Sequence, residues 1–317
     1  MRTVHVLMLR DVHLLDMAGP VQAFYEATSL GGDYELRFCA SEPSIRTAQG
    51  LTMSGLSQPG EVGPDDIVLV PGMDSRTLSR PVPAPHAWLR EAQAAGARIC
   101  SICTGAFPLG QAGLLDGRTC TTHWKLAERL QRSYPNARVV QNRLFARDGN
   151  VVTSAGETSG IDMALALLEE DHGPHLVGRV AREMVVYLRR EGEREQTSVF
   201  LEHRTHLHEG VHRVQDWLVA HADRNPTLEE LARIAAMSPR NLTRVFRQAT
   251  GITLKTFGHR IKLQVARDLL NDRRRTLDSV AASCGFRDPR QLRRLFRDTF
   301  GQSPSEFRDH ATRASAR

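Results

Sequence analysis

The 317-residue chain is 41% hydrophobic and has a net charge of +6, a length and composition that favour two soluble globular domains over one. Its five scattered cysteines follow no secretory signal, so we expect free thiols in a reducing cytoplasm and exclude a disulfide-stabilised secreted protein. The apolar run from Val4 to Leu9 is too short for a signal peptide, and no run of about 18 apolar residues exists, which excludes a membrane-spanning protein.

The charge is divided unevenly along the chain. Residues 209 to 317 hold 21 Lys and Arg against 12 Asp and Glu, a net charge of +9, whereas residues 1 to 208 have a net charge of −3. A basic C-terminal third on a slightly acidic body is typical of a nucleic-acid-binding module attached to a sensing or catalytic domain. The alternative is an arginine-rich surface that is merely solvated.

Residues 1 to about 188 alternate between strand-like and helix-like segments. The strand-like segments are "VHVLML", "YELRFCA", "DIVLVPG" and "GARICSI", and the helix-like ones are "AGPVQAFYEATS", "HAWLREAQAAG" and "TSGIDMALALLEE". This alternation predicts an α/β domain with a doubly wound, mainly parallel sheet. Ligands of such sheets bind at the carboxyl ends of the strands, which directs attention to Asp16, Gly72 and Cys103.

The segment "RICSICTGAFPLGQAGLLDG" has the pattern of a nucleophile turn. An apolar strand ends at Cys103, and a glycine and small residues then begin a helix. We expect the helix N-terminus to lower the pKa of the thiol and to offer N–H groups to an anion. His123 is expected to approach the thiol, and Asp16, on the first loop, to supply a carboxylate. The alternative is that Cys103 only packs at a tight turn beside a satisfied His123.

Several motifs of this domain resemble a known family. The runs "CTGAFPLGQAGLLDGRTCTTHW" and "TSAGETSGIDMAL", with Pro71 and Gly72, are similar to the PfpI/ThiJ-type domain of the class I glutamine amidotransferase-like superfamily. The resemblance is to the version fused ahead of AraC-type domains in bacterial regulators, including actinobacterial regulators of the A-factor-responsive kind. It implies a small-molecule pocket at the strand ends, formed by Asp16, Gly72, Cys103, Thr104 and His123.

The same resemblance bears on catalysis. The enzymes of the superfamily use the cysteine that corresponds to Cys103 as nucleophile, with His123 and Asp16 as the accompanying candidates here. PfpI proteases carry a histidine directly after that cysteine, and this chain carries Thr104, which argues against a protease. Isonitrile hydratase-like relatives share the Cys-Thr-Gly sequence and an early aspartate. We therefore expect a non-catalytic sensor, with a cysteine-dependent hydratase or amidase as the alternative.

The segment after this domain has the character of a linker. In "RREGEREQTSVF", Arg189, Arg190 and Gln196 match the arginine pair and Gly-Gly-Gln stretch of such regulators, while the glycines are replaced. Four histidines follow closely, but no Cys or carboxylate completes a set of metal ligands. We predict no metal site and no cofactor. The four histidines are His203, His206, His208 and His212.

The C-terminal third contains a repeat. "SPRNLTRVFRQATG" at 238–251 returns as "DPRQLRRLFRDTFG" at 288–301, and the flanking residues match at offsets of 49 and then 50. Each copy reads as a helix, a short turn and a second helix, so a whole helix-turn-helix unit is duplicated. The sequence predicts Ser238 as the N-cap, with Pro239 at the first helical position.

The second helix of each copy has two faces. In the first copy Leu242, Val245, Phe246 and Ala249 fall on one side, and arginines fall on the other. The second copy repeats this with Leu292, Leu295 and Phe296. Because such helices enter the major groove of DNA, where Arg binds guanine and phosphate, we predict DNA contacts at Arg240, Asn241, Arg244, Arg247, Arg290, Gln291, Arg293 and Arg294, with Arg297 on the same face.

Between the copies lies "HRIKLQVARDLLND", which predicts a connecting helix of about 20 Å. A rigid spacer of this kind sets two recognition helices about 34 Å apart, one turn of the duplex, so that they enter two adjacent major grooves of double-stranded DNA. A helical module that binds protein instead would show apolar or mixed outer faces. The outer faces here are lined by arginine.

The segment from Val211 to Arg308 resembles the DNA-binding domain of AraC/XylS regulators, with the signature "LDSVAASCGFRDPRQLRRLFRDTFGQSPSEFR". Cys284, Gly285 and Phe286 stand where the family has a buried small residue, a turn glycine and an aromatic residue. The two resemblances imply a transcriptional regulator that forms a homodimer, responds to a small-molecule effector and contacts RNA polymerase. We divide the chain into a sensor and dimerisation domain (1–190), a linker (191–210) and a DNA-binding domain (211–317).

Overall fold

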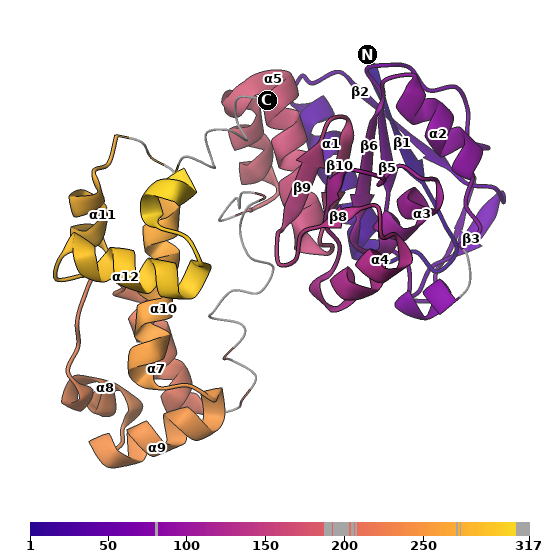
Figure 1. Ribbon diagram of the computed structural model, residues 1–317. Coiled ribbons are helices and arrows are strands. Elements are labelled where there is room, and N and C mark those ends of the chain that lie inside the picture. Colours follow the sequence, from indigo (N-terminus) through magenta and orange to yellow (C-terminus); the bar gives the residue numbers. More distant parts are fainter. Residues whose placement is uncertain are drawn as a thin grey trace. The chain divides into compact units, whose positions relative to one another are not determined.

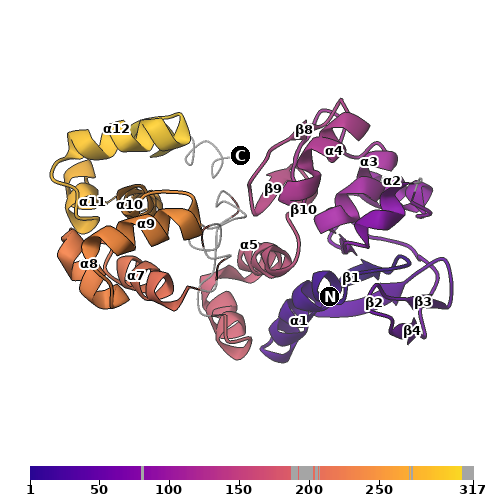
Figure 2. The same ribbon diagram turned by 90° about the horizontal axis from the view of Figure 1, so that it is seen from below.

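The computed structural model describes residues 1–79, 82–186, 192, 203, 206, 208–270, 272 and 274–308. The chain divides into two compact units, residues 1–196 and 197–317, whose elements are labelled in Figures 1 and 2. Arg189, Arg190 and Gln196, which the sequence places around the junction of the sensor domain and the linker, lie outside the described residues. No helix in the described ranges is long and apolar enough to cross a membrane.

The N-terminal unit is built on a twisted sheet whose described strands follow the order β2-β1-β5-β6-β10-β9. All neighbouring pairs are parallel except β9–β10, so the predicted mainly parallel α/β fold is confirmed. The antiparallel edge strand was not predicted. The strands are β1 (Arg2–Leu7), β2 (Tyr34–Cys39), β5 (Ile67–Val70), β6 (Arg98–Ile102), β9 (Phe145–Asp148) and β10 (Val151–Ser154).

Helices cover both faces of this sheet (Figures 1 and 2). On β5, Ile67 and Leu69 join one hydrophobic core, while Val68 and Val70 join the other, because successive side chains of a strand point to opposite faces. The first core is closed by α1 (Leu14–Ser29) and α5 (Thr158–Glu183). The second is closed by α2 (His86–Ala94), α3 (Ala106–Gln111) and α4 (Ala127–Ser133).

Smaller elements complete the unit. They are the hairpin β3 (Ser44–Arg46) and β4 (Thr52–Ser54), the parallel pair β7 (Thr119–Cys120) and β8 (Arg138–Val139), and the 3₁₀ turns η1 (Ser75–Ser79), η2 (Cys103–Gly105) and η3 (Trp124–Leu126). Within α5 the backbone leaves helical geometry at Gly173, with φ of 77°, and Pro174 follows. A kink there is expected, because proline removes a helical hydrogen bond.

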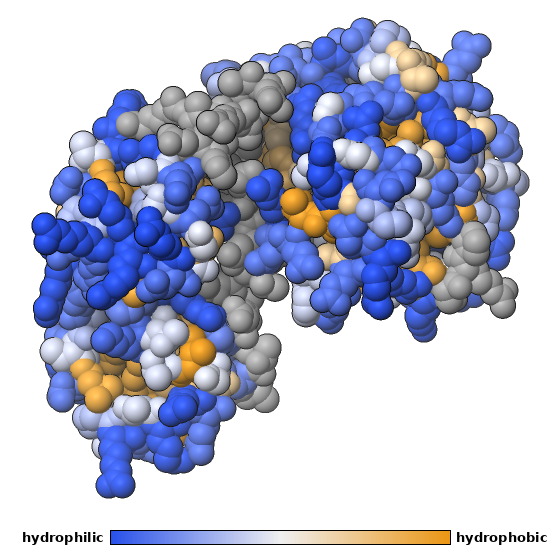
Figure 3. Space-filling model, in the orientation of Figure 1, coloured by the Kyte–Doolittle hydropathy of each residue, from blue (hydrophilic) through white to orange (hydrophobic). Residues whose placement is uncertain are grey.

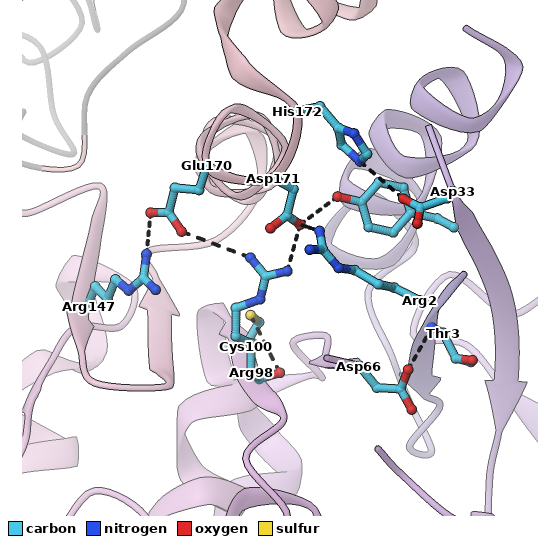
Figure 4. A network of polar contacts seen from close by, with 11 residues as sticks. Arg2, Thr3, Asp33, Asp66, Arg98, Cys100, Arg147, Glu170, Asp171 and His172 are labelled. Carbon is cyan, nitrogen blue, oxygen red and sulfur yellow. Dashed lines mark hydrogen bonds and ion pairs between the residues drawn. The ribbon is translucent and has the colours of Figure 1, made fainter. Parts of the chain in front are cut away.

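A buried ion-pair network fastens α5 to the amino ends of the strands (Figure 4). The carboxylate of Asp171 accepts from Arg98 at 2.6 Å and from the hydroxyl of Tyr34 at 2.6 Å, and it lies 2.8 Å from the guanidinium of Arg2. Burial alone would raise the pKa of Asp171, but these partners hold it below its ordinary value. One carboxylate thus joins β1, β2 and β6 to the helix.

The C-terminal unit is helical. Its helices are α7 (Glu209–Ala220), α8 (Leu228–Ala235), α9 (Pro239–Thr250), α10 (Leu254–Leu270), α11 (Leu277–Ser283) and α12 (Pro289–Phe300). The predicted connecting helix is α10, but it begins five residues earlier than expected, and its 17 residues span about 25 Å. Thr253 explains the earlier start, because its hydroxyl accepts a hydrogen bond from the N–H of Thr256.

The ends of the duplicated helices are specified locally. The side chain of Ser238 caps α9 by accepting from the N–H of Asn241, and Asp288 caps α12 in the same way. Pro239 occupies the first turn of α9, as predicted. Both helices end at a glycine in the left-handed conformation, Gly251 and Gly301.

Candidate DNA interface and strand-end pocket

The helices α9 and α12 present the two predicted faces. In α9, Leu242 and Phe246 are fully buried, and Val245 and Ala249 pack against the same core. In α12, Leu292 and Phe296 are fully buried, with Leu295 beside them. The arginines of the opposite faces are exposed, and the surface over α12 is strongly hydrophilic (Figure 3). They are Arg240, Arg244, Arg247, Arg290, Arg293, Arg294 and Arg297.

These seven arginines have no carboxylate within ion-pair distance anywhere in the described residues. Arg244 instead donates to Asn241 Oδ1 at 2.8 Å and to Gln248 Oε1 at 2.9 Å, so neutral groups hold its guanidinium in place. Gln291 Oε1 accepts from the N–H of Arg287 at 3.1 Å. The two faces therefore retain their positive charge, which suits binding to phosphates and guanine.

The strand ends of the N-terminal unit bring together Asp16, Gly72 and Cys103 in a buried cluster. Cys103 follows β6 and has a φ of 55°, and Gly72 follows β5. Asp16 lies in the first turn of α1 and not on a loop as predicted, because α1 begins already at Leu14. A Cβ on Gly72 would stand 2.2 Å from Asp16 Oδ2 and 2.8 Å from Cys103 Cβ. Only glycine allows this close approach.

Burial is the largest influence on the pKa values of Asp16 and Cys103 in this cluster. Asp16 is fully buried, and burial raises its pKa to about 6, although the N–H of Glu157 donates to Oδ1 at 2.5 Å. Burial and the carboxylate of Asp16 raise the pKa of the Cys103 thiol above its ordinary value. The prediction of a lowered thiol pKa was wrong, because the short helical turn is outweighed by the loss of solvent.

Thr104 and His123 make contacts with different parts of the domain. The hydroxyl of Thr104 accepts from the N–H of Met73 at 2.6 Å and donates to its carbonyl at 2.7 Å, which fastens the turn after β5 to the turn after β6. The described contacts of His123 are with Lys125 N–H at 3.3 Å and with the ring of Trp124. Thr122, its neighbour, donates to the carbonyl of Cys103 at 2.7 Å. The expected approach of the His123 imidazole to the thiol is thus not among these contacts.

Two residues of this cluster were not predicted from the sequence. A Cβ on Gly156 would stand 2.5 Å from Cys103 Cβ, and Glu157, with a φ of 50°, directs its N–H to Asp16. Both belong to "TSAGETSGIDMAL", the motif that was noted for its resemblance but not for a role in the pocket. Their function depends on backbone geometry, which residue type alone does not reveal.

The histidines near residue 206 serve local packing. His203 donates from Nδ1 to the carbonyl of Thr250 at 2.9 Å, and its Nε2 accepts from the guanidinium of Arg260 at 2.9 Å. The ring centroids of His206 and His212 lie 4.6 Å apart. No group of three or more His, Cys, Asp or Glu side chains is placed to hold a metal ion in the described ranges.

Comparison with known proteins places both units. The profile of the DJ-1/PfpI family matches residues 2–170, and that of a helix-turn-helix domain matches residues 231–310. The HTH-type transcriptional regulator CdhR of Pseudomonas aeruginosa is 33% identical over 267 residues, which cover 83% of this chain and 78% of CdhR. The chain belongs to the AraC-type transcriptional regulators that carry a DJ-1/PfpI domain.

Two further similarities of this regulator are to an enzyme and to a solved structure. An isonitrile hydratase of Pseudomonas putida is 30% identical over 173 residues, which cover 52% of this chain and 69% of the hydratase. The crystal structure of a ThiJ/PfpI family protein from Pseudomonas syringae has a TM-score of 0.52 at 21% identity, covering 74% of this chain and 89% of that one. This likeness shows the fold alone.

Proposed function

We propose that this regulator binds double-stranded DNA at two adjacent boxes, one read by α9 and the other by α12. The observation that carries the proposal is the pair of arginine faces, repeated in phase, exposed and without carboxylate partners within the described residues. The first box meets Arg240, Asn241, Arg244 and Arg247, and the second meets Arg290, Gln291, Arg293 and Arg294. The protein acts in the cytoplasm as a homodimer that contacts RNA polymerase.

Selection of bound fragments from random or genomic DNA tests this proposal. We expect two short conserved boxes with centres about one helical turn, 10 to 10.5 base pairs, apart, because two recognition helices on one face reach successive major grooves. The control is the variant Arg90→Ala, which changes an exposed arginine of α2. It should enrich the same fragments. Enrichment of a single box, or of no sequence, would refute the two-box proposal.

For the N-terminal unit we propose a non-catalytic pocket that senses a small molecule. The buried cluster of Asp16, Gly72 and Cys103 lies at the carboxyl ends of the strands, where ligands of such sheets bind, and this supports the proposal. The raised pKa of Cys103 leaves the thiol protonated and weakly nucleophilic at neutral pH. The variant Cys103→Ala should therefore bind operator DNA as tightly as the wild type in the absence of ligand. A tenfold loss of affinity would show that Cys103 has a different role.

A second candidate function, hydration of isonitriles by Cys103, is favoured by the Cys-Thr-Gly turn beside Asp16 and by the similarity to the isonitrile hydratase. The full-length protein should be incubated with alkyl isonitriles and assayed for formamide. Our proposal predicts no turnover above that of Cys103→Ala. Turnover that this substitution abolishes would favour the enzyme.

A further inference from the structure

The described part of the C-terminal unit has two hydrophobic clusters, not one. The first helix-turn-helix unit packs with Phe257 and Ile261 from the first half of α10. The second packs with Leu263, Ala266 and Leu270 from the remainder of that helix. The helix α10 therefore belongs to both helix-turn-helix units (Figure 1). A single shared helix leaves the two recognition helices free to twist relative to each other about it, unless another contact prevents that.

A second contact lies where α10 passes from one cluster to the other, between the loop before α8 and the turn after α11. Asn225 Nδ2 donates to the carbonyl of Gly285 at 2.8 Å. Lys262 Nζ donates to Asn225 Oδ1 at 2.8 Å and to the same Gly285 carbonyl at 3.1 Å. Three hydrogen bonds thus close a triangle between the first unit, α10 and the second unit.

The backbones of the two loops are also in contact here. Gly285 has a φ of 64°, and a Cβ there would stand 2.0 Å from the carbonyl oxygen of Asp223. The glycine is needed both for the left-handed conformation and for the approach of the two loops. The two loops thus lie in direct backbone contact, and the three hydrogen bonds hold them there.

Lys262 is unusual for a lysine in this position. It is only 7% exposed, and within the described residues no carboxylate lies within ion-pair distance of its ammonium group. Burial lowers its pKa. A buried ammonium is costly unless its hydrogen bonds are made, so its position requires both acceptors at once. Displacement of either loop would leave the charge buried with an incomplete set of partners.

We propose that Lys262, Asn225 and Gly285 form a clamp that fixes the separation and rotation of α9 relative to α12, and so sets the number of base pairs between the two boxes. The inference rests on the proposed two-box reading of DNA. One added base pair moves a box by about 3.4 Å and turns it by about 35°. A rigid protein rejects such a change, whereas one that swivels about α10 accepts it. Lys262 and Asn225 are positioning residues, since neither belongs to the recognition helices α9 and α12.

The test measures the affinity of the full chain for fragments that carry the selected pair of boxes with one base pair removed, unchanged or added, and for fragments with a single box. The wild type should lose about tenfold in affinity when one base pair is added or removed. Lys262→Met keeps the methylenes and removes the donors. It should bind the three spacings within about threefold of one another and bind a single box like the wild type.

Lys255→Met is the matched control, because Lys255 lies two turns earlier on α10 and is exposed. It should keep the steep dependence on spacing. Asn225→Ala, at an exposed loop position, should flatten the dependence as Lys262→Met does, and it decides the question should Lys262→Met fail to fold. Spacing profiles identical to that of the wild type would overturn the clamp. Absence of two-box binding by the wild type would instead overturn the proposed function.

Discussion

Asp16 shows how far burial governs chemistry at the scale of one residue. Its pKa is raised from 3.8 to about 6 by burial, so the folded state holds the proton more tightly than the unfolded state. The contribution of Asp16 to the free energy of unfolding is therefore fully present below pH 4, and it is lost as the pH rises through 6. A shift of this size corresponds to about 3 kcal/mol.

We predict that the free energy of unfolding of the wild type falls by about 3 kcal/mol relative to Asp16→Asn between pH 4 and pH 7, because the amide does not titrate. Urea unfolding followed by the fluorescence of Trp88 and Trp124 measures this in a Trp217→Phe background, which removes the tryptophan of the C-terminal unit. If the free energy of unfolding depended on pH in the same way for the two proteins, the folded state would not hold Asp16 in its protonated form.

The residues of the pocket were predictable in part. Cys103 and Gly72 follow apolar strands, so the rule for strand ends located them. Asp16 was found by the same rule, but its helical position was not, because α1 lacks a side-chain cap at His13 that would mark its start. Gly156 and Glu157 were missed, since their contribution is a backbone approach to Cys103 and an N–H directed at Asp16.

At the scale of elements, α5 and the sheet depend on the network around Asp171 (Figure 4). Asp171→Asn should lower the free energy of unfolding by about 3 kcal/mol, because it removes the charge of a largely buried carboxylate that pairs with the partly buried Arg98 and Arg2. Its neighbour provides the control. Glu170→Gln breaks a partly exposed pair with Arg147 and a long contact of 3.9 Å with Arg98, and it should cost less than about 1 kcal/mol. Equal losses for the two variants in urea titrations would contradict this assignment.

Elements with strong periodicity were the most predictable. The two-faced pattern of α9 and α12 and the cap at Ser238 follow directly from the order of apolar and basic residues. The sheet edge was not predicted, because β9 and β10 have only four residues each and a two-residue turn joins them. The burial of Lys262 was also missed, since a lysine between apolar residues reads as solvent-exposed and its acceptors come from two distant loops.

At the scale of the whole molecule, a DJ-1/PfpI unit precedes a duplicated helix-turn-helix unit, as the resemblances of the sequence predicted and the family profiles confirm. The duplication is what distinguishes a two-box DNA reader from a single amphipathic helix. The sequence contains both copies in register, but the contact that joins them at Gly285 depends on tertiary structure.

The central claim is that α9 and α12 each read their own box, and a cycle of protein and base substitutions tests it most directly. Affinities of wild type, Arg240→Ala and Arg290→Ala should be measured by gel-shift titration on fragments with one altered base in either box. Each variant should lose about 1 to 3 kcal/mol on the intact operator and become insensitive to base changes in one box only, a different box for each variant. Unchanged affinity, or equal sensitivity to both boxes in both variants, would contradict the account.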